Sequence, residues 1–292
     1  MLVSTMDLQD RAVDAQLGTL RTLVVGDSHA QGIHYAVLPD TLHIASPGES
    51  VIQTYYRVRR ILERDPPRIE RVVVSLGVHS LVGTKWSIQE PQYWVKVVDY
   101  PELVRRAPDP WARAEEAVLG HLSFVGLGVE IWRDGQRALR DWRKGRAPTT
   151  WQDRLARWDG PETTPSLDEL TPEELERMTR RTVTAHTAYG ADFDPVIADH
   201  LERLLALCRE HGIDALVVEM PVTPRYLEEI GRLVDVERHD RFVREAVRRQ
   251  GADLLDLRRA FDDPGDFSDP EHLSPEGRAK ATLRVRRHLE GA

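Results

Sequence analysis

The chain has 292 residues, of which 41% are hydrophobic and 30% are charged. This length and composition are typical of one large folded domain, or of a domain with an insertion, and they exclude a disordered chain. The formal net charge is −8 and the charges of both signs are interleaved, so the chain lacks the basic surface that nucleic-acid-binding proteins carry.

The single cysteine, Cys208, excludes an intramolecular disulfide. It lies in an amphipathic stretch, which predicts a small buried apolar residue rather than a reactive thiol. The N-terminal residues lack a basic segment followed by an apolar core, and they do not resemble a signal peptide. No apolar run reaches the roughly 18 residues of a membrane span. We therefore expect a cytoplasmic protein.

Short apolar runs alternate with helical patterns in two parts of the chain, residues 1–83 and 193–292. The predicted strands are 23–25, 42–45, 71–76, 215–218 and 254–257, and the predicted helices include 50–64, one ending near Gly212, 238–250, and one opened by Ser274-Pro275-Glu276. Continuous apolar strands between helices predict a parallel sheet covered on both faces. Five strands suit a flavodoxin-like three-layer α/β/α sandwich, whose sites lie beyond the carboxyl ends of the strands.

Residues 84–192 interrupt this alternation, and we interpret them as a helical insertion, or cap. Within it, Thr171-Pro172-Glu173-Glu174 predicts a helix start, and the apolar run 117–132 is too short to span a bilayer. All seven tryptophans lie in this stretch: Trp86, Trp94, Trp111, Trp132, Trp142, Trp151 and Trp158. They either pack the insertion or form a lid, a partner surface or a membrane-surface contact.

The segment Gly26-Asp27-Ser28-His29 follows the first predicted strand. A serine placed between a glycine turn and a helix exposes its hydroxyl at the sheet edge, close to free backbone N–H groups. Since a serine hydroxyl is a weak nucleophile without a base, a partner is needed elsewhere in the chain. The alternative is that Ser28 only caps the helix.

The best partners for Ser28 are Asp269 and His272, three residues apart in the loop before the last predicted helix. Both side chains can turn to the same side, where the carboxylate would hold the tautomer of the imidazole and stabilise the imidazolium. The alternative is that both residues are solvated loop residues.

Together these motifs resemble the first and fifth sequence blocks of the SGNH/GDSL hydrolase superfamily. The runs LVVGDSHAQG and DPEHLSPEG are similar to members related to bacterial polysaccharide O-acetyltransferases, the DltD-like or AlgX-like proteins. The resemblance covers about residues 21–83 and 195–290. It implies a flavodoxin-like fold, with Ser28 as the nucleophile and Asp269 and His272 completing a triad.

The resemblance also implies an oxyanion hole formed by the N–H groups of Ser28 and Gly48 and by an asparagine of the third block. Here the third block reads Gly77-Val78-His79-Ser80, so that His79 stands in the place of the asparagine. A histidine N–H can donate to an oxyanion. The alternative is a histidine that only fills a loop.

Other polar residues are weaker candidates. Asp27, His29 and Glu219 are candidate pocket residues, although we expect His29 and His34 on the helix surface and leave open an outward-facing Glu219. We expect Arg225 to be solvated. Asp27-x-His29 resembles the opening of calcineurin-like metallophosphoesterases, but the later ligand blocks are missing, so we expect no metal and no cofactor.

The sequence therefore predicts a serine-dependent ester hydrolase or O-acyltransferase that works through an acyl-enzyme intermediate. Its partner would be a small-molecule or glycan ester, or an acyl acceptor. Contact with a membrane surface stays open although nothing in the sequence supports it, and the oligomeric state stays open as well. The alternative is a non-catalytic binding or scaffold protein of the same fold, which uses the tryptophan-rich insertion as its contact surface.

Overall fold

The computed structural model describes residues 5–16, 18–33, 38, 40–64, 68–83, 91–106, 166–188 and 190–291. The chain divides into two compact units, residues 1–8 with 87–161 and residues 9–86 with 162–292. Of the first unit, the described helices are α3 (Pro91–Val97) and α4 (Tyr100–Arg106). The sheet and the candidate site belong to the second unit.

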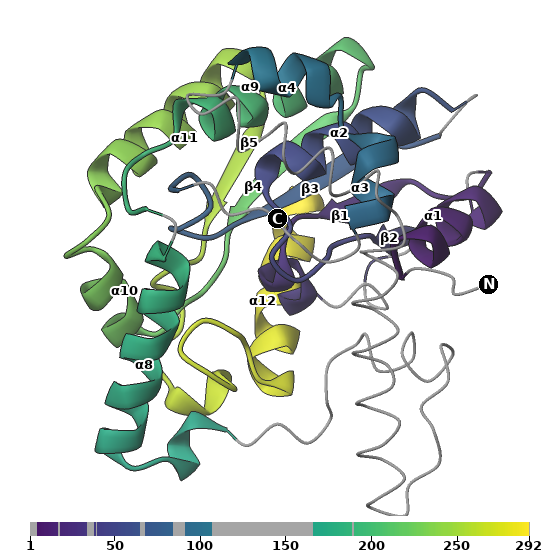
Figure 1. Cartoon of the computed structure of the whole chain (residues 1–292). Helices are drawn as coiled ribbons and strands as arrows, with labels where there is room; N and C mark the ends of the chain where they lie inside the picture. The colour runs from purple at the N-terminus through teal and green to yellow at the C-terminus, as the bar shows by residue number, and fades with distance from the viewer. Residues whose placement is uncertain are drawn as a thin grey trace, which may run out of the picture. The chain divides into compact units, whose positions relative to one another are not determined.

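The second unit is built on a five-stranded sheet in which neighbouring strands are parallel (Figure 1). The strands are β1 (Thr22–Val25), β2 (Thr41–His43), β3 (Arg71–Leu76), β4 (Asp214–Glu219) and β5 (Asp253–Asp256). Their order across the sheet is β2-β1-β3-β4-β5. This order changes direction beside β1, which is where open α/β sheets form their sites. The predicted flavodoxin-like α/β/α fold is confirmed.

Helices cover both faces of the sheet (Figure 1). α2 (Val51–Leu62), α9 (Pro195–Glu210) and α11 (Val236–Gln250) pack side by side on one face, and α12 (Pro275–Leu289) lies on the other with the 3-10 helix η1 (Ser28–Gly32). The other described elements are α1 (Thr5–Gln16), η4 (Leu167–Glu169), α8 (Pro172–Thr187), α10 (Pro224–Ile230) and η5 (Pro264–Asp266). The sequence had predicted β3 to the residue and the other strands to within two residues, but it did not predict α1.

The ends of several helices follow capping residues that the sequence offers. The side chain of Ser274 accepts a hydrogen bond from the N–H of Gly277 and starts α12 as predicted. Thr171 and Glu174 form a reciprocal capping box at the start of α8. Gly212, just beyond α9, has a φ of +67°, which is the left-handed conformation expected after a helix end.

Two apolar clusters fix the elements around the site. One joins the sheet to α12 and includes Val24, Val73, Val218, Phe267, Leu273 and Val285. The other joins α8 and α10 to the loop after β3 and includes Val78, Val82, Val183, Tyr226, Leu227 and Ile230. The second cluster matters for the site because it brings α8, which lies far from the sheet motifs in sequence, against the carboxyl edge of the sheet.

The predicted insertion, residues 84–192, is described in part. Trp94 is buried, whereas the other six tryptophans and the apolar run 117–132 lie outside the described residues. The predicted domain boundaries stay a prediction. Cys208 is buried as predicted, and burial raises the pKa of its thiol to about 12. Among the described helices, none combines the length and the apolar character needed to cross a membrane.

Candidate active site

Ser28 lies just beyond the carboxyl end of β1, at the first position of η1. The chain turns there at Gly26, whose φ of +132° favours glycine. A Cβ at this position would lie 2.8 Å from the carbonyl oxygen of Ser75 in β3, so the close approach of the two strands also requires glycine. Asp27 caps η1, because its Oδ1 accepts a hydrogen bond from the N–H of His29 at 3.0 Å. The alternative of Ser28 as the cap is therefore wrong.

The loop of residues 267–273, which precedes α12, is held at its base and at its tip. Its two ends form an antiparallel bridge, and the N–H of Ser268 donates to the carbonyl oxygen of His272 at 2.9 Å. At the tip, the carbonyl oxygen of Pro270 accepts hydrogen bonds from both the N–H and the hydroxyl of Thr223, at 2.9 and 3.0 Å. These bonds fix the orientation of the side chains that the loop carries.

The structure brings Ser28, His272 and Asp269 together in one hydrogen-bonded chain. The Oγ of Ser28 lies 2.8 Å from Nε2 of His272, and Nδ1 of His272 lies 2.8 Å from Oδ2 of Asp269. The other carboxylate oxygen of Asp269 accepts the N–H groups of Glu271 and His272, each at 2.9 Å. Asp269 is therefore fixed by its own loop and aimed at the imidazole.

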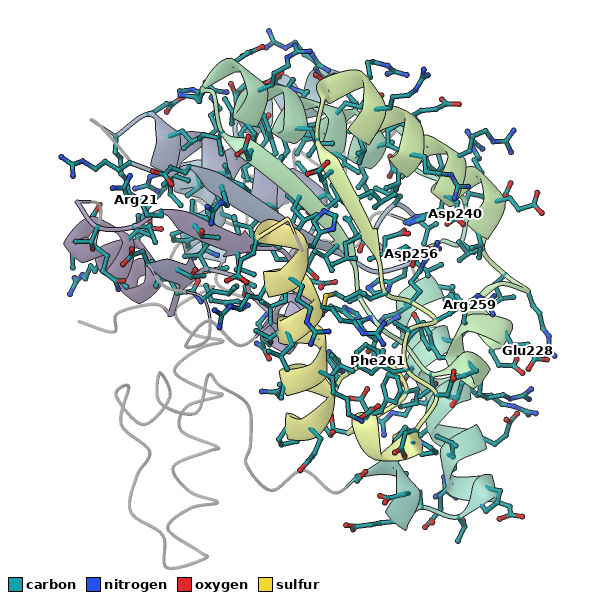
Figure 2. The ribbon with its side chains drawn as sticks, turned by 180° about the vertical axis from the view of Figure 1, so that it is seen from behind. Arg21, Glu228, Asp240, Asp256, Arg259 and Phe261 are labelled. Carbon is teal, nitrogen blue, oxygen red and sulfur yellow. The ribbon has the colours of Figure 1, made fainter. Side chains whose placement is uncertain are left out.

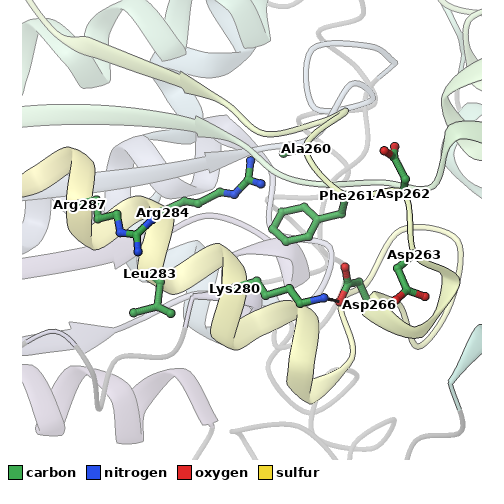
Figure 3. Close-up of a pocket in the computed structure, with 9 residues that line it drawn as sticks. All are labelled: Ala260, Phe261, Asp262, Asp263, Asp266, Lys280, Leu283, Arg284 and Arg287. Atoms are coloured by element: carbon green, nitrogen blue, oxygen red, sulfur yellow. Dashed lines mark hydrogen bonds and ion pairs between the residues drawn. The ribbon is translucent and has the colours of Figure 1, made fainter. Parts of the chain in front are cut away.

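The triad side chains are partly open to solvent, with 29% exposure for His272 and 37% for Asp269. A separate cavity of about 350 Å³ lies between α12 and the loop after β5. In this region Arg284 lies over the ring of Phe261 and Lys280 contacts Asp266 (Figure 3). No triad residue lines this cavity.

Gly48 lies in the loop between β2 and α2, with a φ of +71°. This loop is tied to the serine turn, because the N–H of Ser46 donates to the carbonyl oxygen of Gly26 at 3.2 Å. In the described part of the chain, no residue accepts a hydrogen bond from the N–H of Ser28 or of Gly48. Both groups suit the predicted oxyanion hole, which stays a prediction.

His79 follows β3 as predicted and is buried. Its Nε2 lies 3.4 Å from Oδ2 of Asp27, its Nδ1 lies 3.4 Å from the hydroxyl of Tyr226, and its ring stacks on that of His186 with centroids 3.8 Å apart. Burial, together with the neighbouring His186, lowers the pKa of His79 to about 3. Since both ring nitrogens face partners, donation to an oxyanion would require one of these contacts to break.

His29 is only 3% exposed, so the expectation of a surface histidine is wrong. Its Nδ1 lies 3.0 Å from Oδ1 of Asp27, its Nε2 lies 3.4 Å from Oε2 of Glu271, and its ring stacks on that of His272. Burial alone would lower the pKa of His29, but the carboxylates of Asp27 and Glu271 outweigh it and raise the pKa to about 10. His34 lies outside the described residues.

Three further residues lie beside the triad that the sequence analysis did not assign to it: Glu271, His186 and Tyr226. Oε2 of Glu271 lies 3.0 Å from Nε2 of His186, whose Nδ1 lies 2.7 Å from the hydroxyl of Tyr226. Burial would raise the pKa of Glu271, but His186 and His29 hold it well below its ordinary value. Burial, together with Glu271 and Asp27, raises the pKa of Tyr226 well above its ordinary value, so it remains a phenol. Of these three residues, only Glu271 could have been predicted from the sequence, because it lies between Asp269 and His272 in the same motif.

Glu219 lies in a different polar cluster, where it contacts Nε2 of His239 at 2.7 Å and Nη2 of Arg258 at 3.0 Å. Arg258 also contacts Asp240 and Asp256, which are both labelled in Figure 2. This cluster ties α11 to the ends of β4 and β5, and no described contact joins Glu219 to the triad. Arg225 is bound to three surface carboxylates, those of Glu176, Glu228 and Glu229.

Two buried sets of side chains have the composition of a metal site. The first set is Asp27, His29 and His79, and the second is His79, His186 and Glu271. Within each set the possible ligand atoms lie within 4.8 Å of one another. Imidazole nitrogens and carboxylate oxygens suit zinc and related ions. The same atoms also pair directly with one another at 3.0–3.4 Å, as ionised and hydrogen-bonding side chains do without an ion.

A family model described as DltD protein matches residues 198–290 of the chain. The matched part begins within α9, ends after α12, and contains Asp269 and His272 but not Ser28. No curated protein matches the chain. The chain is therefore similar to DltD over its C-terminal part, in line with the predicted DltD-like resemblance, whereas the wider SGNH superfamily stays a prediction.

Proposed function

We propose that the protein is a serine-dependent ester hydrolase or O-acyltransferase that works through an acyl-enzyme intermediate. The observation that carries this proposal is the chain of two 2.8 Å contacts from Ser28 through His272 to Asp269. The similarity of residues 198–290 to DltD supports it independently, since that family is associated with acyl transfer and hydrolysis.

In the first step of the proposed mechanism, Nε2 of His272 removes the hydroxyl proton of Ser28, and Oγ attacks the carbonyl carbon of an ester. Asp269 holds the hydrogen of His272 on Nδ1 and thereby leaves Nε2 free to accept the proton. The N–H groups of Ser28 and Gly48 would stabilise the oxyanion of the tetrahedral intermediate. The imidazolium then protonates the leaving alcohol, and the acyl group stays on Ser28.

In the second step Nε2 of His272 removes a proton from the incoming nucleophile, which attacks the carbonyl carbon of the acyl-enzyme. The imidazolium then returns this proton to Oγ of Ser28 as the bond between the acyl group and Oγ breaks. If this nucleophile is water, the protein is an esterase. If it is the hydroxyl of a sugar or a metabolite, the protein is an O-acyltransferase. Supplying polyol acceptors to the acetylated protein and measuring O-acetylated product against free acetate separates the two.

The test uses an activated acetyl ester and a fluorophosphonate probe on the full chain. The wild type should hydrolyse the ester and be labelled, and Ser28→Ala should lose both, with a fall in kcat of about 10³-fold or more. Ser166→Ala is the matched control, since Ser166 is a partly buried loop serine whose hydroxyl makes no hydrogen bond within the described part of the chain. Ester turnover that survives in Ser28→Ala would contradict the proposal, and complete inertness of the folded wild type would favour the non-catalytic binding protein.

A further inference from the structure

We propose that a closed ring of six buried side chains beside the triad positions Ser28 and His272 relative to each other, at hydrogen-bond distance. This inference rests on the proposed function and deepens it. The ring joins η1, the loop after β3, α8, α10 and the loop before α12. Its members, called here the buried ring, are Asp27, His29, Glu271, His186, Tyr226 and His79.

The contacts of the buried ring close on themselves. In order, they are Asp27 to His29 at 3.0 Å, His29 to Glu271 at 3.4 Å, Glu271 to His186 at 3.0 Å, His186 to Tyr226 at 2.7 Å, Tyr226 to His79 at 3.4 Å, and His79 back to Asp27 at 3.4 Å. No member is more than 9% exposed. The two contacts of Oε2 of Glu271 lack standard hydrogen-bond geometry and are ion pairs.

In the buried ring, the partner of each histidine nitrogen determines whether that nitrogen carries a hydrogen. Both nitrogens of His29 face carboxylates, and a nitrogen lone pair would repel a carboxylate oxygen at this distance, so both nitrogens carry hydrogen. For the same reason, Nε2 of His79 and Nε2 of His186 carry hydrogen. Tyr226 lies between the Nδ1 atoms of these two rings and has one hydrogen to donate, so one of the two rings must donate to its oxygen.

His79 is the ring that accepts the hydrogen of Tyr226, because its low pKa keeps it neutral. His186 then donates at both nitrogens, like His29. Two imidazolium groups thus balance the carboxylates of Asp27 and Glu271, and the buried ring has no net charge. This balance matters because an unpaired charge in a buried site is strongly destabilising.

The buried ring connects the two loops that carry the triad. Asp27 and His29 flank Ser28 on both sides, and Glu271 precedes His272. The direct link between the two loops at the triad is one hydrogen bond across 244 positions of sequence, and a single hydrogen bond of this kind holds two loops together only weakly. The path from Asp27 through His29 to Glu271 is a second link between the same loops, and His29 also stacks on the reacting imidazole at 5.1 Å.

The first experiment is Glu271→Gln, which keeps the size of the side chain and removes its charge. We expect kcat for the activated ester and the rate of fluorophosphonate labelling to fall together by about 10- to 100-fold, with KM unchanged, because a shift of about 1 Å between reacting groups has effects of this size. The matched control is Glu176→Gln. Glu176 also joins α8 to α10, through a surface contact with Arg225 at 2.9 Å, and this variant should keep wild-type rates.

The second experiment needs no substitution and is independent of whether the variant folds. Nitrogen NMR of the histidine rings of the wild type should show two N–H groups on His29 and one on His79 throughout the range from about pH 3 to about pH 10 in which the protein stays folded. The groups that face His29 and set this state are Asp27, Glu271, His79 and His272.

Three outcomes would overturn the inference. The first is a Glu271→Gln protein with wild-type kcat and labelling rate, provided that Ser28→Ala is inactive; an active Ser28→Ala would instead overturn the proposed function. The second is a His29 signal that titrates near 6.5, the ordinary histidine value. The third is one equivalent of zinc in the purified protein whose removal changes the His79 and His186 signals, because these atoms would then be metal ligands.

Discussion

Two groups of polar side chains lie side by side at this edge of the sheet, and they differ in exposure and in composition. The triad is partly exposed, and its one hydroxyl, that of Ser28, is paired with a histidine. The buried ring has three histidines, two carboxylates and a phenol, and none is more than 9% exposed. Chemistry on an ester requires an accessible nucleophile, whereas a buried set of charges is stable only when each charge is paired. This difference agrees with the proposed division, in which the triad would carry out the reaction and the buried ring would align its members.

The largest loss of kcat that would test these two roles is expected when Asp269 is replaced. Replacing it with asparagine keeps an oxygen for the loop N–H groups but removes the carboxylate that holds the hydrogen of His272 on Nδ1. We expect Asp269→Asn to lower kcat by about 10⁴-fold, which is the scale of a wrong imidazole tautomer in a serine triad. Steady-state kinetics with the activated ester measure it.

The matched control for this prediction is Asp263→Asn. Asp263 also accepts a backbone N–H, that of Gly265 at 2.9 Å, and it stands in the same region of the chain ahead of the triad loop. It has no contact with Ser28 or His272, so its kcat should equal that of the wild type. Equal losses in the two variants would mean that loop stability, and not the carboxylate at position 269, sets the rate.

A smaller effect is expected at His79, and it decides whether this residue belongs to the oxyanion hole or to the buried ring. If His79 donates to the oxyanion, then His79→Asn restores the usual residue of the third block and should maintain or raise kcat. If it belongs to the buried ring, asparagine cannot span the distance between Asp27 and Tyr226, and kcat should fall by about 10- to 100-fold. We expect the fall, and a kcat at or above the wild-type value would remove His79 from the ring.

Much of the fold was predictable because its signals are local. Apolar strand runs, the cap at Ser274 and the glycine after α9 each depend on residues within one turn of the chain. The convergence of Ser28 with His272 and Asp269 was predictable because the two motifs follow strand ends, and the carboxyl ends of parallel strands meet at one edge.

The buried ring was not predictable in the same way. His29 was assigned to a helix surface, but η1 is a short 3-10 helix whose second residue points into the protein. His186 lies in the segment interpreted as an insertion, and only the packing of α8 against α10 brings it to Tyr226. No local pattern in the sequence encodes a contact across 40 positions between a histidine and a tyrosine on separate helices.

The smallest expected effect concerns stability rather than rate, and it separates the two groups by their response to pH. The pKa of His29 is raised from 6.5 to about 10 on folding, so the folded state holds its proton more tightly than the unfolded state. The resulting stabilisation is complete below pH 6.5 and is lost as the pH rises through about 10. We therefore expect the free energy of unfolding of the wild type to exceed that of His29→Gln most below pH 6.5. The gap should narrow towards pH 10 by at most about 1.4 kcal/mol per pH unit, the limit for one proton. Urea unfolding of both proteins across this range measures the gap, and a gap independent of pH would show that His29 is not held as an imidazolium and that the buried ring lacks the charge balance inferred for it.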